Sequence, residues 1–367
     1  MWFPDQPPLL FPSESNKSFI ETYCYPSVPT GSFAGRETGL VIPELDASVQ
    51  QYFEGGLASS TLKTYRSGLS KFMLFCAKFG VSNPFPISQE LLCYYVAYLA
   101  NNGLAYQTIK TYLAAIRHVQ IAQGLPEPKQ YASMPKLKVV EKRVRKIRAL
   151  DKPSRPRLPI TPAILRQIRA LWSPKSRDFT HIMLWAVACT CFFGFFRLGE
   201  LLVPTGHGFD IQLHLAVSDL AVDNPTDPRI LQIHLKRSKT DQFHTGTNVF
   251  IGRTGDELCP VAALMAYLAV RGMKQGLLFL TRDEQPLRRE CVIDNIRQAL
   301  QTLGLESSHY AGHSFRIGAA TTAAERGFPD STIKVLGRWK SDAYRTYIRL
   351  PRQWLASLSG QLSAATH

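Results

Sequence analysis

The stretch that decides the fold is residues 310–349, YAGHSFRIGAATTAAERGFPDSTIKVLGRWKSDAYRTYIR. His313 and Arg316 stand three residues apart, so a helix places both on one face. A run of small residues beginning at Gly318 follows, and it lets that helix pack closely. Tyr347, near the end, is a weak nucleophile unless positive charge and a base assist it. The stretch therefore predicts a basic cradle for an anion with a nucleophile beside it.

Outside this stretch, charge points to the kind of partner. The 367 residues suffice for two ordinary domains of about 100 to 200 residues each. The balance of 43 Lys and Arg against 28 Asp and Glu gives a net charge of +15, which makes nucleic acid the first candidate partner.

The same composition argues against several classes of protein. No apolar run approaches the roughly 20 residues that cross a membrane, so we expect a soluble protein. The start, MWFPDQPPLL, has no basic segment followed by a long apolar one, so we expect no secretory signal. Seven scattered cysteines without a CxxC motif disfavour a disulfide framework or a zinc site and fit a reducing compartment.

The first third of the chain separates into an arm and a helical domain. Residues 1–44 carry seven prolines without periodicity, which predicts a poorly ordered arm. Apolar residues recur at helical steps from Ser59, from Ser88 and after Gly103, so we expect a compact helical domain over residues 45–135. Its exposed basic side chains either contact phosphates or only solubilise the surface: Lys63, Arg66, Lys71, Lys110, Arg117 and His118.

A basic run follows this domain. Residues 136–157, KLKVVEKRVRKIRALDKPSRPR, hold ten Lys and Arg against two acids, a composition typical of a solvated linker. We expect a linker at residues 136–158. Crossing a duplex, it would neutralise several phosphates, each worth about 0.9 in the log-log salt slope. The candidates are Lys142, Arg143, Arg145 and Lys146. In a eukaryotic cell KRVRKIR also resembles a nuclear import signal.

The remaining residues, 159–367, read as a second domain. Thr161 and Pro162 form a helix start, and residues 181–202 are apolar nearly all round, which predicts a buried central helix. β-rich runs at 213–222, 229–235 and 247–251 predict a small antiparallel sheet. Further helices are expected at 260–271, 289–303, from His313 onward, and at 354–362. The expected fold class is mainly α with a small antiparallel β-sheet.

One arginine stands within the apolar segment of this domain. The guanidinium of Arg197 must find an anion, because an unpaired buried charge is very costly. Its partner is either Glu200, three residues on, or the phosphate of a ligand, which a guanidinium grips with two parallel hydrogen bonds.

The order of these residues resembles the tyrosine recombinase (phage integrase) family over roughly residues 50–360. The set comprises Arg197, Lys239, the run His313-Ser314-Phe315-Arg316, Arg338 with Trp339, and Tyr347-Ile348-Arg349. Arg197 and Arg316 lie 119 residues apart, and Tyr347 follows 31 residues later. The segments SKTDQF, CPVAAL and YAGHSFRIGAATTAA are similar to those of integrase-like proteins of DIRS-type and Ngaro-type retroelements. The resemblance implies a SAM-like helical core-binding domain followed by an α+β catalytic domain.

The resemblance also implies roles for individual residues. Arg197 and Arg316 resemble the arginines that clamp the scissile phosphate and stabilise its transition state. His313 resembles a proton handler or phosphate donor. Lys239 resembles the lysine that protonates the leaving 5′ oxygen, with Lys236 and Arg237 as rivals.

Two positions remain open. Tyr347 resembles the nucleophile, and Tyr344 is its competitor three residues earlier. The family usually has histidine or tryptophan nine residues before the nucleophile, where this chain has Arg338, and Trp339 follows one residue later. Either side chain is a candidate for that place. Glu200 resembles an acidic residue that orients the first arginine.

The implied activity is DNA strand breakage and rejoining through a 3′-phosphotyrosyl intermediate. It needs no ATP, metal or other cofactor, and its partner is double-stranded DNA. Family members act as pairs or tetramers, so the C-terminal apolar residues either contact a neighbouring copy or pack on their own domain: Trp354, Leu355, Leu358 and Leu362. The alternatives are a DNA-binding protein derived from such an enzyme that no longer cuts, and an enzyme that only nicks and relaxes DNA.

Overall fold

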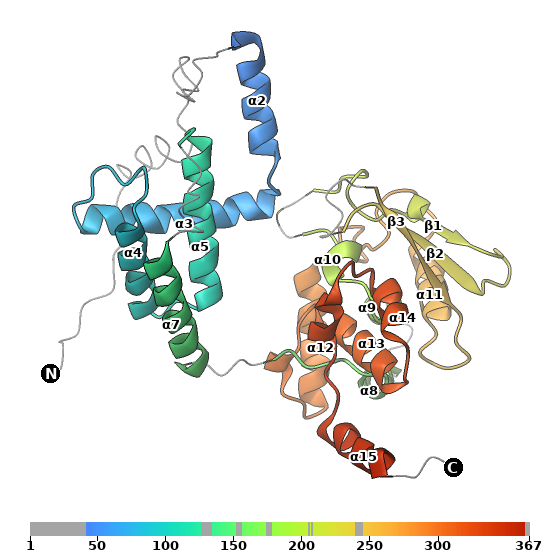
Figure 1. The fold of residues 1–367 in the computed structure, drawn as a ribbon. Coiled ribbons are helices and arrows are strands. Elements are labelled where there is room, and N and C mark those ends of the chain that lie inside the picture. Colours follow the sequence, from blue (N-terminus) through green and yellow to red (C-terminus); the bar gives the residue numbers. More distant parts are fainter. Residues whose placement is uncertain are drawn as a thin grey trace. The chain divides into compact units, whose positions relative to one another are not determined.

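The computed structural model describes residues 42–125, 134–151, 156–173, 178–204, 206, 208–238 and 245–363 (Figure 1). The chain forms two compact units, Met1–Ser154 and Arg155–His367, each with its own hydrophobic core. They are mainly helical and hold one small antiparallel sheet, which confirms the predicted fold class. The predicted arm, 1–44, lies outside the described residues except for its last three.

The N-terminal unit is built from helices. They are α2 (Pro43–Gly55), α3 (Ser59–Lys78), α4 (Gln89–Asn101), α5 (Tyr106–Ala122) and α7 (Pro135–Asp151). The predicted starts at Ser59 and Ser88 are confirmed, and the Ser88 hydroxyl caps α4 by accepting from the Leu91 N–H at 3.1 Å. Helices α3 and α5 approach closely at Gly68, where a Cβ would lie 2.8 Å from the Tyr112 ring.

Two predictions for this unit are corrected, and the first concerns His118. It was expected on an exposed face, but its ring stacks on Phe53 of α2 at 5.0 Å and lies 5.6 Å from the Tyr65 ring. Burial lowers the pKa of this imidazole. The stack links α2, a helix that the sequence did not predict, to the rest of the unit.

The second correction concerns the basic run. Most of the expected linker is helix α7, which packs against α4 with Leu137 and Val144 buried. The helix was missed because its apolar positions recur every three or four residues among many charges. Such a narrow apolar stripe is enough when a neighbouring helix covers it. The main-chain N–H of Lys136 also donates to the Gln89 side chain at 3.0 Å, which ties the start of α7 to the start of α4.

The C-terminal unit surrounds one apolar helix, α9 (Phe179–Phe193), in which every residue from Met183 to Phe192 is buried. This confirms the predicted central helix over residues 181–193. The rest of the predicted apolar segment, 194–202, is not part of it, because Gly194 ends the helix and a turn leads into the short helix Leu198–Leu201. The remaining helices are α8 (Pro162–Trp172), α10 (Leu198–Leu201), α11 (Pro260–Arg271), α12 (Arg289–Thr302), α13 (Ser314–Glu325), α14 (Asp330–Gly337) and α15 (Arg352–Ser363), with short 3-10 turns η2 (Val217–Asp219), η3 (Ser307–His309) and η4 (Asp342–Tyr347). Helices α11 and α13 both pack on α9.

The sheet has the order β1 (Leu220–Val222), β2 (Ile230–Leu235) and β3 (Thr247–Gly252), all antiparallel. Its inner face buries Ile233, which pairs with Val249. The first strand is shorter than predicted, because the chain before it forms η2, where the Asp219 carboxylate accepts from the Ala216 N–H at 2.7 Å. No described helix combines the length and apolar composition that crossing a bilayer requires.

Candidate active site

Arg316 lies at the centre of the site, on the first turn of α13. Its side chain is 0% exposed, and its two terminal nitrogens donate to the carbonyls of Phe195 and Gly337. The Trp339 ring covers the guanidinium, with its centroid 4.2 Å from the Cζ atom. Burial, aided by the positive charge of Arg197, lowers the pKa of Arg316 to about 9. The site therefore holds concentrated positive charge away from water.

Arg197 approaches from the turn between α9 and α10. Its Nη1 lies 2.6 Å from Oε1 of Glu200, and its main-chain N–H donates to Oε2 of the same carboxylate at 2.9 Å. Arg197 thus forms an ion pair with Glu200, one of its two expected partners. The Arg197 side chain keeps 17% exposure while that of Glu200 keeps 6%, so the pair leaves the guanidinium partly open.

Arg338 ends α14 in the left-handed conformation, with φ of 55°. Its guanidinium turns inward. Nη1 donates to the Gly194 carbonyl at 2.8 Å, and Nη2 lies 3.3 Å from Oε2 of Glu200. Burial lowers the pKa of Arg338, and the Glu200 carboxylate opposes that shift.

Trp339 folds back over Gly337, where a Cβ would lie 1.6 Å from the indole ring. Its ring centroid is 5.1 Å from that of Tyr347 and 6.3 Å from that of Tyr344. The indole therefore lies between Arg316 and the two candidate nucleophiles.

Tyr344 and Tyr347 occupy the same short turn, η4, but differ in exposure. Tyr344 is 1% exposed, and its hydroxyl accepts from Arg345 Nε at 3.1 Å. Tyr347 is only half-buried, and its ring lies 5.6 Å from the Arg316 guanidinium carbon and 6.3 Å from the His313 ring. His313 itself is exposed at the start of α13.

Lys239 lies outside the described residues, in the connection between β2 and β3. Its rival Lys236 is described and is engaged elsewhere. Its ammonium lies 2.7 Å from the Asp219 carboxylate and donates to the His214 carbonyl at 3.1 Å. Lys236 therefore braces η2 against β2. Arg237 is half-buried.

One residue of the site was missed. The buried hydroxyl of Thr321 on α13 contacts the main chain on both sides of Ile348, accepting from the Arg349 N–H at 2.9 Å and donating to the Tyr347 carbonyl at 3.4 Å. Thr321 lies within a run of alanines and threonines, which suggested only close helix packing and not a role in the site.

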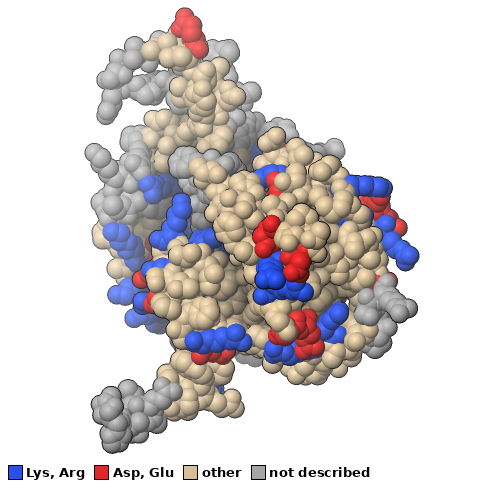
Figure 2. Space-filling model, turned by 90° about the vertical axis from the view of Figure 1, so that its right-hand side faces the viewer, with Lys and Arg blue, Asp and Glu red and all other residues tan. Residues whose placement is uncertain are grey.

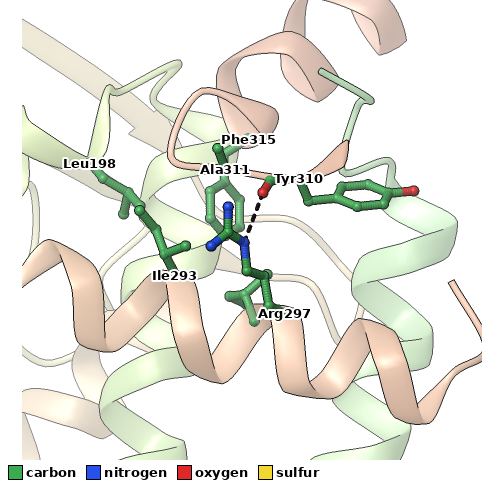
Figure 3. A pocket seen from close by; sticks show the side chains of 7 residues that line it. Leu198, Ile293, Arg297, Tyr310, Ala311 and Phe315 are labelled. Carbon is green, nitrogen blue, oxygen red and sulfur yellow. Dashed lines mark hydrogen bonds between the residues drawn. The ribbon is translucent and has the colours of Figure 1, made fainter. Parts of the chain in front are cut away.

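A small pocket lies beside the site, and one of its lining residues, Arg297, supports the turn that leads into His313. Figure 3 shows the Arg297 side chain reaching from α12 to the main chain of Tyr310, where Nε donates to the carbonyl at 3.1 Å. Its other walls are mostly apolar and include Leu198 and Phe315. The Arg297 hydrogen bond therefore anchors the chain just before α13, and nothing in the lining of the pocket indicates a ligand.

The predicted phosphate contacts of the N-terminal unit are all exposed: Lys63, Arg66, Lys71, Lys110, Arg117, Lys142, Arg143, Arg145 and Lys146. On the face shown in Figure 2, by contrast, basic and acidic side chains lie next to one another in several places. One surface pair of the C-terminal unit is Arg253 with Asp227, at 2.6 Å. This pair neutralises the positive charge of Arg253.

Comparison with known proteins identifies the family of the chain. Residues 49–121 match the N-terminal SAM-like domain of phage integrases, and residues 213–350 match the phage integrase family. The integrase/recombinase xerD homolog of Selenomonas ruminantium is 27% identical over 310 residues, covering 81% of this chain and 83% of that protein. The chain belongs to the phage integrase family of tyrosine recombinases.

Solved structures share the fold. XerH site-specific recombinase, in a post-cleavage complex with a palindromic difH substrate, has a TM-score of 0.58 at 16% identity, covering 83% of this chain and 80% of that one. A lambda integrase dimer bound to a COC′ core site has a TM-score of 0.52 at 15% identity, covering 91% and 85%.

The activity of this family is site-specific recombination by the tyrosine recombinase mechanism. DNA strands are broken and rejoined through a covalent 3′-phosphotyrosyl intermediate, and the chain is an enzyme of this class. The resemblance inferred from the motifs is thereby confirmed at the level of the family.

Proposed function

We propose that the chain cleaves and rejoins double-stranded DNA at a site formed by Arg197, Lys239, His313, Arg316 and Tyr347. The observation that carries the proposal is the Tyr347 ring, 5.6 Å from the Arg316 guanidinium and 6.3 Å from the His313 ring. A tyrosine with a reference pKa of about 10 needs such neighbouring charge to become a nucleophile.

In the proposed reaction the Tyr347 oxygen attacks the scissile phosphorus, and the bond to the 5′ oxygen breaks. Lys239 gives that oxygen its proton, His313 handles the proton of the tyrosine, and Arg197 and Arg316 offset the charge of the transition state. The covalent link retains the phosphoester energy. A second DNA end therefore reverses the step without ATP, metal or other cofactor.

Arg338 and Trp339 are the two candidates for the position that the family usually fills with histidine or tryptophan before the nucleophile. Trp339 is the better supported of the two. Its ring contacts both Arg316 and Tyr347, and its buried Nε1 has no hydrogen-bond partner in the described part of the chain. That N–H is available to a phosphate oxygen. Because Arg316 is 0% exposed, the proposal requires the rings of Trp339 and Tyr347 to shift when DNA enters.

The exposed basic residues of α3, α5 and α7 are proposed to contact the DNA backbone. Because α7 is a packed helix, its solvent side presents Lys142, Arg143, Arg145 and Lys146 as a rigid set. Binding would weaken with salt in proportion to the phosphates contacted, each adding about 0.9 to the log-log slope.

Assembly as a dimer or tetramer on DNA is also proposed. Helix α15 supports this, since Leu355 on it is 48% exposed while Trp354 and Leu358 are half-buried. The side chain of the fourth candidate, Leu362, lies outside the described set.

For the source of the chain, we propose a DIRS-type or Ngaro-type retroelement and action in the nucleus of a eukaryotic cell. The support is the amino-acid sequence of the motifs, notably SKTDQF and YAGHSFRIGAATTAA, and the basic run KRVRKIR. A reverse transcriptase reading frame beside the coding sequence is the expected genomic context, and its absence from every copy would contradict this origin.

The experiment that tests the function uses a pool of nicked duplexes of random sequence, designed so that cleavage releases a short fragment and traps the covalent complex. The wild type is expected to form a denaturant-resistant protein–DNA adduct, and sequencing of the trapped duplexes gives the target. Tyr347→Phe is expected to bind DNA but form no adduct.

Tyr344→Phe is the matched control, since it removes a hydroxyl from the same turn and should leave adduct formation intact. An adduct from Tyr347→Phe and none from Tyr344→Phe would show that the nucleophile is misassigned. A wild type that binds DNA without forming an adduct is a silent binding protein, and the proposal would be wrong.

A further inference from the structure

We infer that Arg338 is a positioning residue, which holds the turn carrying Arg197 and shares its carboxylate partner instead of contacting the scissile phosphate. The inference rests on the proposed function, because it assigns a role inside that site. It is carried by the contacts of Arg338 and by the backbone of the turn that those contacts hold.

The Arg338 guanidinium is committed to the protein interior. Nη1 donates to the carbonyls of Gly194 at 2.8 Å and Leu336 at 3.4 Å, and Nη2 donates to the Phe195 carbonyl at 3.2 Å and the Glu200 carboxylate at 3.3 Å. The side chain is 14% exposed. Both terminal nitrogens, which together grip a phosphate, are therefore already in use.

The turn that receives these bonds needs support. It follows the C-terminus of α9, where main-chain carbonyls lack helical partners. Phe195 within it adopts φ of 50°, a conformation that is unfavourable for a bulky side chain. Its carbonyl accepts from both Arg316 and Arg338. Two arginines from the C-terminal part of the domain thus fix the residues immediately before Arg197.

Glu200 transmits the same constraint directly. Its Oε1 pairs with the Arg197 guanidinium, and its Oε2 accepts from the Arg197 main chain and from Arg338. Loss of Arg338 would leave Oε2 with one partner and let the carboxylate rotate, taking the Arg197 guanidinium with it.

The backbone of Arg338 completes the arrangement. Its left-handed conformation directs the guanidinium inward and lets the next residue, Trp339, fold over Gly337 toward Tyr347. One residue thereby braces the first arginine, while its neighbour takes the place beside the nucleophile.

The test measures single-turnover cleavage at saturating protein on the duplex recovered with the wild type. A twin substrate carries a methylphosphonate at the scissile position. This group lacks the negative charge that a phosphate-contacting arginine neutralises, so the loss of such an arginine matters less on it. Arg338→Met is expected to be about 10- to 100-fold slower than wild type on the phosphate duplex, with unchanged DNA affinity, and to lose most of this deficit on the neutral duplex, because it acts through Arg197. Arg197→Met is expected to regain activity on the neutral substrate.

Two further variants show whether Arg338 acts through Arg197. The double variant Arg197→Met, Arg338→Met is expected to be no slower than Arg197→Met alone on the phosphate duplex, because Arg338 has no effect once Arg197 is absent. Arg289→Met removes an exposed arginine paired at the surface with Glu290 at 2.9 Å, and it controls for loss of charge alone.

A double variant that is slower than Arg197→Met by the full factor seen for Arg338→Met would overturn the inference and make Arg338 an independent phosphate contact. A wild-type rate for Arg338→Met would overturn it too. If Arg338→Met does not fold, Glu200→Gln decides: slowing that the methylphosphonate duplex relieves supports the inference, and a wild-type rate contradicts it. A failure of the proposed function is distinct, because the wild type itself would form no adduct.

Discussion

The hydroxyl of Thr321 accepts a hydrogen bond from the main-chain N–H of Arg349 at 2.9 Å. The same hydroxyl donates to the Tyr347 carbonyl at 3.4 Å. Thr321 lies one turn and a half after Arg316 on α13 and is fully buried. The proposed nucleophile is thus tied, through one side chain, to the helix that carries its charged neighbour.

Thr321→Val keeps the shape of this side chain and removes the hydroxyl. It should lower the free energy of unfolding by about 1 to 3 kcal/mol, because the half-buried Arg349 N–H loses its acceptor. Cleavage should slow by about tenfold or more at unchanged DNA affinity, as Tyr347 loses its anchor. Thr321→Ser should restore the rate. The readouts are urea denaturation and single-turnover cleavage.

The adjacent threonine is the control for that experiment. The Thr322 hydroxyl is buried and has no hydrogen-bond partner among the described residues, so Thr322→Val should cleave at the wild-type rate. If the two valine variants are equally slow, the threonine hydroxyl does not position the nucleophile.

Gly318→Ala tests the close packing predicted from the small-residue run. A Cβ at this position would lie 1.9 Å from the carbonyl oxygen of Ile160, a main-chain atom that has little freedom to move. We expect a loss of about 1 to 3 kcal/mol or more from such overpacking, measured by chemical denaturation. At Gly255 a Cβ would meet nothing within 4 Å, so Gly255→Ala should be close to neutral. Equal stability of the two variants would contradict the packing.

Leu137→Ala tests whether α7 is a packed helix. Leu137 is 1% exposed and Val139 is 68% exposed on the same helix. Truncating Leu137 should cost about 2 to 5 kcal/mol, whereas Val139→Ala should stay within about 0.5 kcal/mol. Hydrogen exchange of the α4 and α7 amides measures both. Residues 136–151 that exchange freely in the wild type would restore the linker interpretation.

His118 should make the N-terminal unit less stable in acid. Burial lowers its pKa in the folded state, so below about pH 6.5 the unfolded chain binds the proton more readily than the folded chain. Stability is therefore fully present above that pH and falls as the pH drops toward the folded pKa. His118→Gln should flatten this dependence in denaturation midpoints between pH 7 and 5. An NMR titration placing His118 above 6.5 would refute the prediction.

Much of the fold was predictable because it rests on periodicity. The apolar positions of α3, α4, α5 and α9 recur as a helix requires, and Ser88 and Thr161 occupy the capping positions their chemistry favours. The errors occurred where packing outweighed composition. The apolar stripe of helix α7 is too narrow to stand out among the charged residues. His118 is half-buried against α2, a helix whose position depends on tertiary contact.

The stretch from His313 to Tyr347, with Arg197 upstream, determined the family, because residue types in a fixed order are written in the chain itself. The sequence could not determine which way each side chain points, because backbone conformation and neighbours at long range decide it. Arg338 and Trp339 are adjacent in sequence, yet the left-handed turn at Arg338 sends one guanidinium to Glu200 and the next ring to Tyr347. Only the tertiary structure separated these two residues, because only there do Gly194, Phe195 and Glu200 meet the end of α14.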